Sequence, residues 1–141
     1  MLLTSASLLL LTVVSEANLE FSEDMENGFT VGWEFDGEDI IFEVSAPTLG
    51  WVGIGFSETK SKKKADLIMM GMKDGKPYAW DAYSDMTGMV QIDFDQDVTI
   101  LDSAENGTTY MKIKRSLKTK DATRDNEIFV KFLCLHSQRR Q

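Results

Sequence analysis

The chain has very few of the side chains that carry out nucleophilic or redox chemistry. Its 141 residues include one histidine, His136, and one cysteine, Cys134. A Ser-His-Asp or Cys-His arrangement would have to be built from that single histidine at the far C-terminus. Catalytic zinc and type-two copper centres use several imidazoles, which one histidine cannot supply. A lone cysteine also excludes a disulfide within the chain, so the core has to hold the fold, with a bound ion as one way to assist it.

Positive charge is scarce, and long hydrophobic runs are absent. There are 15 Lys and Arg residues against 23 Asp and Glu, which gives a net charge of −8. Nucleic acids and anionic membranes would repel such a chain, so neither is an expected partner. The apolar run at 8–14 is too short to span a bilayer, which takes ~20 residues. We therefore expect no membrane insertion.

The N-terminal stretch resembles a targeting segment. The apolar run is followed by Ser15-Glu16-Ala17, and this order predicts a secretory signal peptide over residues 1–17, although no Lys or Arg precedes the run. The sequon Asn106-Gly107-Thr108 predicts an exposed, glycosylated turn. Together these features indicate a protein that is secreted to the extracellular space or the lumen of a secretory vesicle.

The rest of the chain is patterned for strands. No segment of useful length keeps a 3.6-residue apolar period, which argues against a helix bundle. Short alternating runs, such as 40–46 with Ile40, Phe42 and Val44 on its inner face, are separated by Gly- and Asp-rich turns such as 73–76. This pattern indicates an all-β sandwich. We expect an acidic lead-in over 18–28, one domain over 29–135 and a short tail over 136–141. The predicted strands are 29–35, 40–46, 51–57, 65–72, 77–84, 89–94, 97–102, 108–115 and 127–135.

Five aspartates crowd into residues 80–97, where the pattern otherwise resembles a strand: Asp81, Asp85, Asp93, Asp95 and Asp97. Calcium and sodium prefer carboxylate and carbonyl oxygens and need neither thiol nor imidazole. Asp66 also opens an apolar strand, an unusual place for an unpaired charge. Spacing alone favours a solvated acidic face over a metal site. Paired carboxylates for glycoside hydrolysis are a weaker alternative.

Three segments together resemble a known family. They are GWVGIGFSE, ADLIMMGMKDGKPYAWDAYSD and QIDFDQDVTILDSAENGTTYMKIKRSLKTKD. In order and spacing they are similar to the DOMON domain, in the version that heads dopamine β-monooxygenase and its monooxygenase-like relatives. The similarity runs from Phe29 to Leu135. It implies an immunoglobulin-like β-sandwich that acts as a non-catalytic regulatory or interaction module, with a protein partner or a small-molecule ligand.

The resemblance also implies a structural calcium or sodium site. Its ligands would be the carboxylates of Asp66 and Asp97 and the backbone carbonyls of Leu67 and Ala82. The remaining aspartates of the 80–97 segment would then mostly lie on a solvated rim.

Two departures qualify the resemblance. Lys120 stands where the monooxygenase branch usually has a cysteine. The copper-binding domains that follow in such enzymes do not occur within the 141 residues, so we expect no enzyme activity. The chain is expected to be either a DOMON-only protein or a truncated fragment of a longer monooxygenase.

Other DOMON branches bind haem b through one Met and one His, or bind sugars. His136 is the candidate haem ligand, but lysines at 62–64 stand where the usual methionine lies. We interpret Met69, Met70 and Met72 as core residues, since methionine fills irregular gaps. For a sugar, the available aromatic side chains are Tyr78, Trp80 and Tyr83. A haem b electron-transfer domain is the main alternative function.

Overall fold

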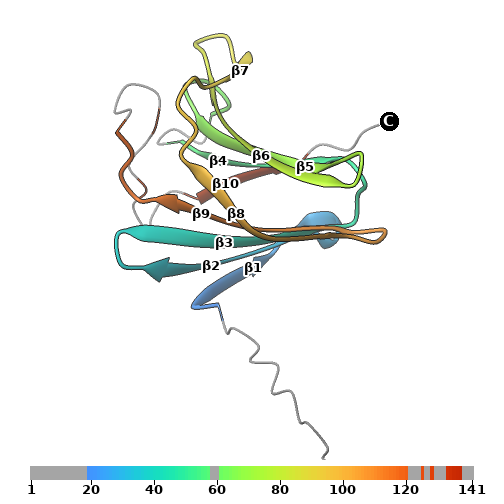
Figure 1. Ribbon diagram of the computed structural model, residues 1–141. Coiled ribbons are helices and arrows are strands. Elements are labelled where there is room, and N and C mark those ends of the chain that lie inside the picture. Colours follow the sequence, from blue (N-terminus) through green and yellow to red (C-terminus); the bar gives the residue numbers. More distant parts are fainter. Residues whose placement is uncertain (1–18, 58–60, 121–124, 126–127, 129–132, 138–141) are drawn as a thin grey trace, which may run out of the picture.

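Two antiparallel sheets pack face to face in the computed structural model, which describes residues 19–57, 61–120, 125, 128 and 133–137, the last range by its backbone (Figure 1). The first sheet has the strand order β1-β2-β3-β9-β8 and the second has the order β10-β4-β5-β6-β7. The first comprises β1 (Phe21–Asp24), β2 (Thr30–Asp36), β3 (Asp39–Ala46), β9 (Thr109–Ser116) and β8 (Val98–Glu105). The second comprises β10 (Leu133–Ser137), β4 (Trp51–Phe56), β5 (Asp66–Lys73), β6 (Lys76–Ser84) and β7 (Val90–Ile92). This architecture confirms the predicted β-sandwich.

Strand alternation decides which side chains form the core between the sheets. Along β3, Ile40, Phe42 and Val44 are buried and their neighbours are partly exposed, as the sequence predicted. From the second sheet, Ile68 and Met70 close the core from the opposite side. Each such side chain contributes ~1.5–3 kcal/mol through its removal from water.

Tight turns set the register of the neighbouring strands. Asp74 and Gly75 join β5 to β6 with φ values of 52° and 72°. A two-residue hairpin of this type needs positive φ at both central positions, which Asp-Gly tolerates well. The predicted turn at 73–76 is therefore confirmed, and it aligns Leu67 with Ala82 further along the ladder.

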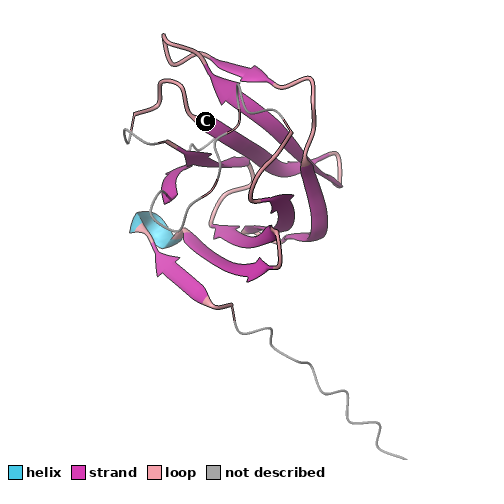
Figure 2. Cartoon of the chain, turned by 90° about the vertical axis from the view of Figure 1, so that its left-hand side faces the viewer, coloured by secondary structure: helices cyan, strands magenta, loops and turns pink. Residues whose placement is uncertain are grey.

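The lead-in holds a strand that the sequence did not predict. Strand β1 pairs with β2, and the ring of Phe21 stacks on Trp33 with centroids 5.6 Å apart. All four residues of β1 are exposed, which explains why the acidic segment showed no strand signal. The short 3₁₀ turn η1 (Glu26–Gly28) then leads into β2 (Figure 2).

Three other sequence expectations differ from the structure or fall outside it. Only Met70 lies in the core: Met69 lies on the other face of β5, and Met72 shares the face of Met70 but is partly exposed near the end of the strand. The predicted strand at 89–94 is reduced to the three residues of β7, and residues 93–97 form a loop. The predicted signal peptide lies outside the described residues, and among those residues no helix is long and apolar enough to span a bilayer.

Candidate functional site: a buried arginine–aspartate cluster

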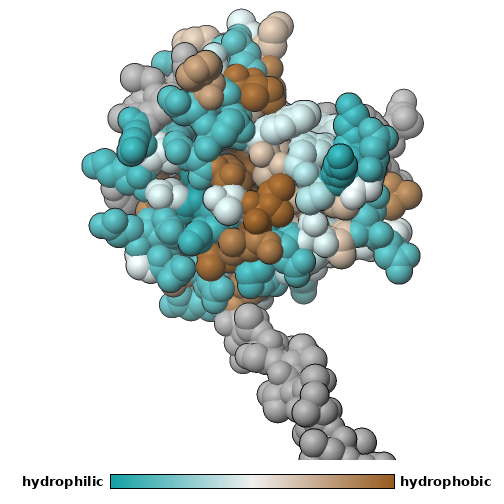
Figure 3. Space-filling view, viewed as in Figure 1, coloured by the Kyte–Doolittle hydropathy of each residue, from teal (hydrophilic) through white to brown (hydrophobic). Residues whose placement is uncertain are grey.

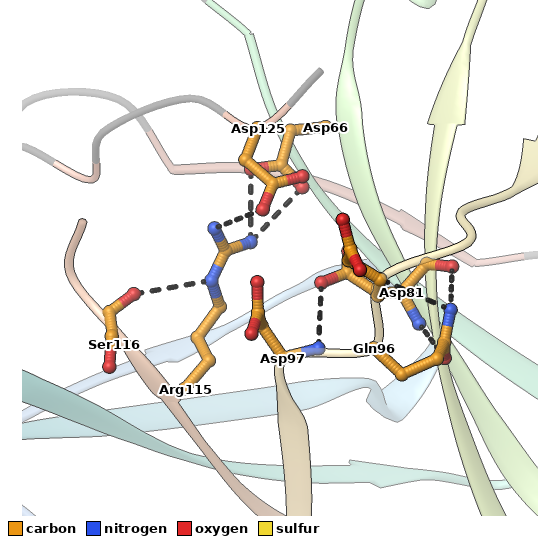
Figure 4. A network of polar contacts seen from close by, with 8 residues as sticks. Asp66, Asp81, Gln96, Asp97, Arg115, Ser116 and Asp125 are labelled. Atoms are coloured by element: carbon orange, nitrogen blue, oxygen red, sulfur yellow. Dashed lines mark hydrogen bonds and ion pairs between the residues drawn. The ribbon is translucent and has the colours of Figure 1, made fainter. Parts of the chain in front are cut away.

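An arginine lies fully buried between the two sheets. Met111, Ile113 and Arg115 alternate along β9 and all point inward, so Arg115 occupies a core position and is 1 % exposed. Its Nη1 donates to both carboxylate oxygens of Asp66, at 3.0 Å to Oδ1 and 2.9 Å to Oδ2 (Figure 4). Asp66 begins β5 and is likewise inaccessible to solvent. This ion pair joins the two sheets directly.

Three further groups surround the guanidinium of Arg115. Its Nε lies 3.4 Å from the carbonyl of Ser116, and its Cζ lies 5.4 Å from the ring centroid of Phe56. Its Nη2 is 3.9 Å from Oδ2 of Asp125, a side chain that is only 4 % exposed. The aromatic face and the second carboxylate both favour the charged arginine.

Asp81, on β6, is the second buried carboxylate contributed by the sheets. Its Oδ2 lies 3.4 Å from the backbone N–H of Asp97, while no described residue donates a hydrogen bond to its Oδ1. Burial, reinforced by the nearby charge of Asp125, raises the pKa of Asp81 to about 7, and Arg115 partly opposes the rise. Asp81 is therefore poised between its neutral and charged forms near neutral pH.

A glutamine side chain fixes the loop that carries Asp97. The Oε1 of Gln96 accepts a hydrogen bond from the N–H of Asp81 at 2.9 Å. Its Nε2 donates to the carbonyls of Asp81 and Asp93, at 3.0 and 2.8 Å. These bonds take the place of a regular ladder after β7, so the loop is held against β6 and Asp97 stays beside Asp81.

The cluster is strongly acidic and closed to solvent. Carboxylate oxygens of Asp66, Asp81 and Asp125 lie within 4.8 Å of one another, and one guanidinium lies among them. Such oxygens are the ligands that hard cations prefer. A substrate could not reach them without local opening, because Asp66 and Asp81 are fully buried. The arrangement is suited to tying the sheets together.

The four predicted cation ligands lie around this cluster. Asp66 is in it, and the residue after it, Leu67, is the direct partner of Ala82 across the β5–β6 ladder. The N–H of Ser84 donates to the carbonyl of Ala65, and hydrogen-bonded pairs alternate along an antiparallel ladder, so Leu67 and Ala82 also form a hydrogen-bonded pair. This bonding uses one lone pair of each carbonyl oxygen and leaves the second lone pair for another ligand. The partly exposed side chain of Asp97 points toward the space between Arg115 and Asp81 (Figure 4). A cation at these four residues stays a prediction.

The expected solvated rim is partly wrong. Asp81 is 0 % and Asp93 is 5 % exposed, because both turn toward the protein interior. Asp95 is exposed as expected. Asp85 stabilises a surface turn by accepting hydrogen bonds from the N–H and hydroxyl of Thr87 and from the N–H of Met89, which lower its pKa.

Sequence reasoning did not assign Arg115 or Asp125 to the site. A signal for Arg115 was available, since it follows Met111 and Ile113 at the inward positions of the predicted strand. Asp125 belongs to a segment without any periodic pattern, so nothing local identified it.

The other two predicted site residues, Asn106 and His136, are not part of this cluster. Asn106 is exposed in the turn between β8 and β9, as a glycosylated residue needs to be. His136 lies in β10, where its backbone pairs with Gly53 of β4. The side chain of His136 is outside the described part of the structure.

Comparison with characterised proteins identifies relatives for most of the chain. The chain is 33 % identical over 99 residues to human DBH-like monooxygenase protein 1, and the aligned region covers 70 % of this chain and 16 % of that protein. It is 32 % identical over 105 residues to MOXD1 homolog 2 of Drosophila melanogaster, covering 72 % of this chain and 14 % of that protein. The chain thus spans only about a sixth of the length of these relatives.

A solved structure and a family model agree on the fold. The cytochrome domain of Myriococcum thermophilum cellobiose dehydrogenase superposes with a TM-score of 0.53 at 17 % identity, covering 66 % of this chain and 50 % of that one. That similarity concerns the fold alone. The DOMON domain model matches residues 25–131, which span the arginine–aspartate cluster and the eight strands from β2 to β9. The chain therefore belongs to the DOMON domain family, as a relative of the DBH-like monooxygenases.

Proposed function

We propose that this chain is a secreted, non-catalytic DOMON module that binds a protein partner or a small molecule, and that a structural cation completes its acidic cluster. The observation that carries the proposal is the burial of Asp66, Asp81 and Arg115, each at most 1 % exposed. Catalytic groups have to contact a substrate. A cluster that is sealed between two sheets instead serves to hold the two sheets together. Binding is then left to the surface.

The charges in the cluster favour a cation. One guanidinium faces the carboxylates of Asp66 and Asp125, and Asp81 adds a third negative charge whenever it ionises. The Oδ1 atom of Asp81 is buried without a hydrogen-bond donor among the described residues. A buried polar atom of this kind is costly unless it gains a partner. Calcium or sodium would supply one.

Asp66 and Asp97 would hold this ion by their carboxylates, with the free lone pairs of the Leu67 and Ala82 carbonyls nearby. Asp66 and Leu67 come from β5, Ala82 comes from β6, and Asp97 comes from the loop before β8. An ion shared by these elements would reinforce the connection that Gln96 already makes between the loop and β6.

Thermal melting tests the cation site. Calcium chloride, compared with choline chloride at matched ionic strength and with a chelator, should raise the Tm by a few degrees, because a ligand that binds the folded state stabilises it. Sodium chloride against choline chloride tests the monovalent ion. The Asp97→Asn variant should lose the response, and Asp95→Asn, at an exposed position two residues away, should keep it. Equal Tm values in all salts would remove the cation from the proposal.

A haem b electron-transfer domain is the second candidate. The backbone register places His136, Gly53, Met69 and Trp80 in one row across β10, β4, β5 and β6. Gly53 is buried but has no side chain, and adjacent strands are ~4.8 Å apart, so positions 136 and 69 lie about two strand spacings apart with no side chain of β4 between them. A histidine and a methionine are a known axial pair for haem iron.

A haem titration separates the two candidates. A Soret band that forms on adding haem, and is lost in both His136→Ala and Met69→Leu, would favour the electron-transfer domain. Unchanged free-haem absorbance with the wild-type protein would exclude it. Met72→Leu is the matched control, since Met72 is also partly exposed but lies outside this row.

A further inference from the structure

Strand β7 forms one edge of the second sheet and is unusually apolar for an exposed edge. It has a neighbour, β6, on one side only in the described sheet. Val90 and Ile92 are 46 % and 51 % exposed, and Phe94, just beyond the strand, is 92 % exposed. Hydrophobic residues are accordingly visible among hydrophilic ones at the top of the molecule in Figure 3, where Figure 1 places β7. Soluble proteins usually protect such edges with charge or proline.

The backbone of β7 points its free hydrogen-bonding groups outward at two positions. The bonds from Asp85 N to Met89 O and from Asp93 N to Asp81 O flank the pair formed by Gln91 and Tyr83. Hydrogen-bonded pairs occur at every second position of an antiparallel ladder, and the Gln91–Tyr83 pair lies two residues from each of these bonded pairs. Gln91 therefore directs its N–H and C=O toward β6. The N–H and C=O of Val90 and Ile92 then point away from the sheet.

We propose that β7 pairs antiparallel with β7 of a second copy of this chain, about a two-fold axis at Gln91. Val90 of one copy then lies opposite Ile92 of the other, and the two residues exchange both of their outward hydrogen bonds. The apolar side chains of these residues meet on one face of a continuous ten-stranded sheet. The proposal names the partner of the binding module described above, and it is independent of the cation site.

Charge around the strand is complementary under the same axis. The turn at Gly88 lies beside the exposed 62–64 lysine segment, since a methyl group placed on Gly88 would be 3.9 Å from the Lys62 carbonyl and from the stem of Lys63. If the register continues, Gly88 faces Phe94 of the second copy. The exposed Asp95 of that copy then comes next to the lysine segment, and the same contact repeats on the other side of the axis.

The exposed apolar surface is about as large as such an interface needs. Six of the large exposed apolar side chains lie within residues 80–94: Trp80, Met86, Met89, Val90, Ile92 and Phe94. A fully exposed large side chain presents ~150–250 Å², and these six are 43–92 % exposed, so the patch amounts to roughly 600 Å². A specific interface buries ~800 Å² per partner. An anionic membrane is a poor occupant for the same patch, given the net charge of −8.

Sedimentation equilibrium of the purified chain over a wide range of concentration tests this pairing. We expect the wild-type mass to rise toward that of a dimer as the concentration increases. Ile92→Pro removes an outward N–H without removing a bond to β6. It should raise the dissociation constant of the dimer about tenfold or more, because the two-fold axis repeats the change and two intermolecular hydrogen bonds are lost. Leu101→Lys, at an exposed position on β8 at the edge of the other sheet, should leave dimerisation unchanged.

A second pair of variants guards against misfolding and tests the charges. Ile92→Lys keeps the backbone donor and should also weaken the dimer, with the near-UV circular dichroism of the monomer unchanged. Lys63→Glu and Asp95→Lys should each weaken it, and the double variant should recover part of the loss. A monomer at every concentration, a dimer unaffected by either Ile92 variant, or pairing only with added strand peptides would each overturn the proposal. A missing response to calcium would leave this test unaffected.

Discussion

Strand β9 carries basic side chains to both faces of its sheet, and the two faces use them differently. Lys112 and Lys114 point outward and pair with Glu43 and Asp39 of β3, at 2.6 and 3.5 Å, where the side chains remain 19–34 % exposed. Arg115 points inward and pairs with Asp66 at 2.9 Å, with both side chains at 0 % exposure. The same strand therefore offers a matched comparison between surface and buried ion pairs.

Burial changes what such a pair contributes. Exposed pairs gain little because water already solvates both charges and because holding long side chains still costs entropy. A buried pair need not stabilise more than apolar residues would, but removing one of its members leaves an uncompensated charge in the interior. The inward pair thus makes the packing of the two sheets specific, while the outward pairs mainly keep the surface polar.

The largest expected effect comes from Arg115→Met, which keeps the stem of the side chain and removes its charge. The carboxylates of Asp66 and Asp125 would be left buried without their cation, so the free energy of unfolding should fall by ~3–5 kcal/mol. Urea denaturation measures the change. Lys112→Met on the outer face is the matched control and should cost less than ~1 kcal/mol. Equal losses in the two variants would mean that burial does not set the contribution of these pairs.

The second expected effect is a pH dependence that originates at Asp81. Its pKa is raised from 3.8 to about 7, chiefly by burial, so the folded chain holds a proton that the unfolded chain releases. Stability should therefore fall as the pH rises from about 4 to about 7, by up to ~1.4 kcal/mol per pH unit, and then level off. Asp81→Asn should flatten this slope in denaturation curves measured across the range. A wild-type slope that persists in the variant would assign the effect to another group.

A third, smaller effect concerns the loop that brings Asp97 to the cluster. Gln96→Glu removes the Nε2 donor and places a carboxylate against the carbonyls of Asp81 and Asp93. We expect a loss of ~2 kcal/mol, because two acceptors lose their donor. Gln91→Glu, at an exposed position, still accepts from the Tyr83 hydroxyl but loses its long 3.5 Å bond to Oδ2 of Asp85, and should cost less than ~1 kcal/mol because water solvates both carboxylates. Hydrogen exchange of the Asp97 amide would show whether the loop itself opens.

The sequence predicted the framework of this molecule much better than its interior charges. Period-two alternation placed Ile40, Phe42 and Val44 inward, and the Asp74-Gly75 turn set the register of β5 and β6 correctly. Both signals are local, so a single segment was sufficient to detect them. Strand β1 was missed because an exposed edge strand imposes little pattern on its side chains.

The cluster depends on residues that are far apart in the chain, and this limited its prediction. Asp81 and Asp85 have the same side chain and lie four residues apart, yet one is buried and the other caps a surface turn. Their difference arises from β5, β9 and Asp125, which local spacing does not reveal. Asp66 was singled out because a charge at the start of an apolar strand is unusual, and its partner Arg115 lies 49 residues away.

The smallest expected effect comes from the outward pair itself. A double-mutant cycle on Lys112→Ala and Glu43→Ala should give a coupling energy of ~0.5–1 kcal/mol, since the pair is short but about a fifth exposed. Glu43 raises the pKa of Lys112 by hydrogen bonding, which agrees with a favourable contact. Because water and ions reach this pair, high salt should reduce the coupling. The cycle on Arg115→Met and Asp66→Asn should be larger and nearly independent of salt, since ions cannot reach a pair with no exposed surface. A salt-sensitive inner pair would mean that the cluster opens to solvent, and the cluster would then be accessible to ligands after all.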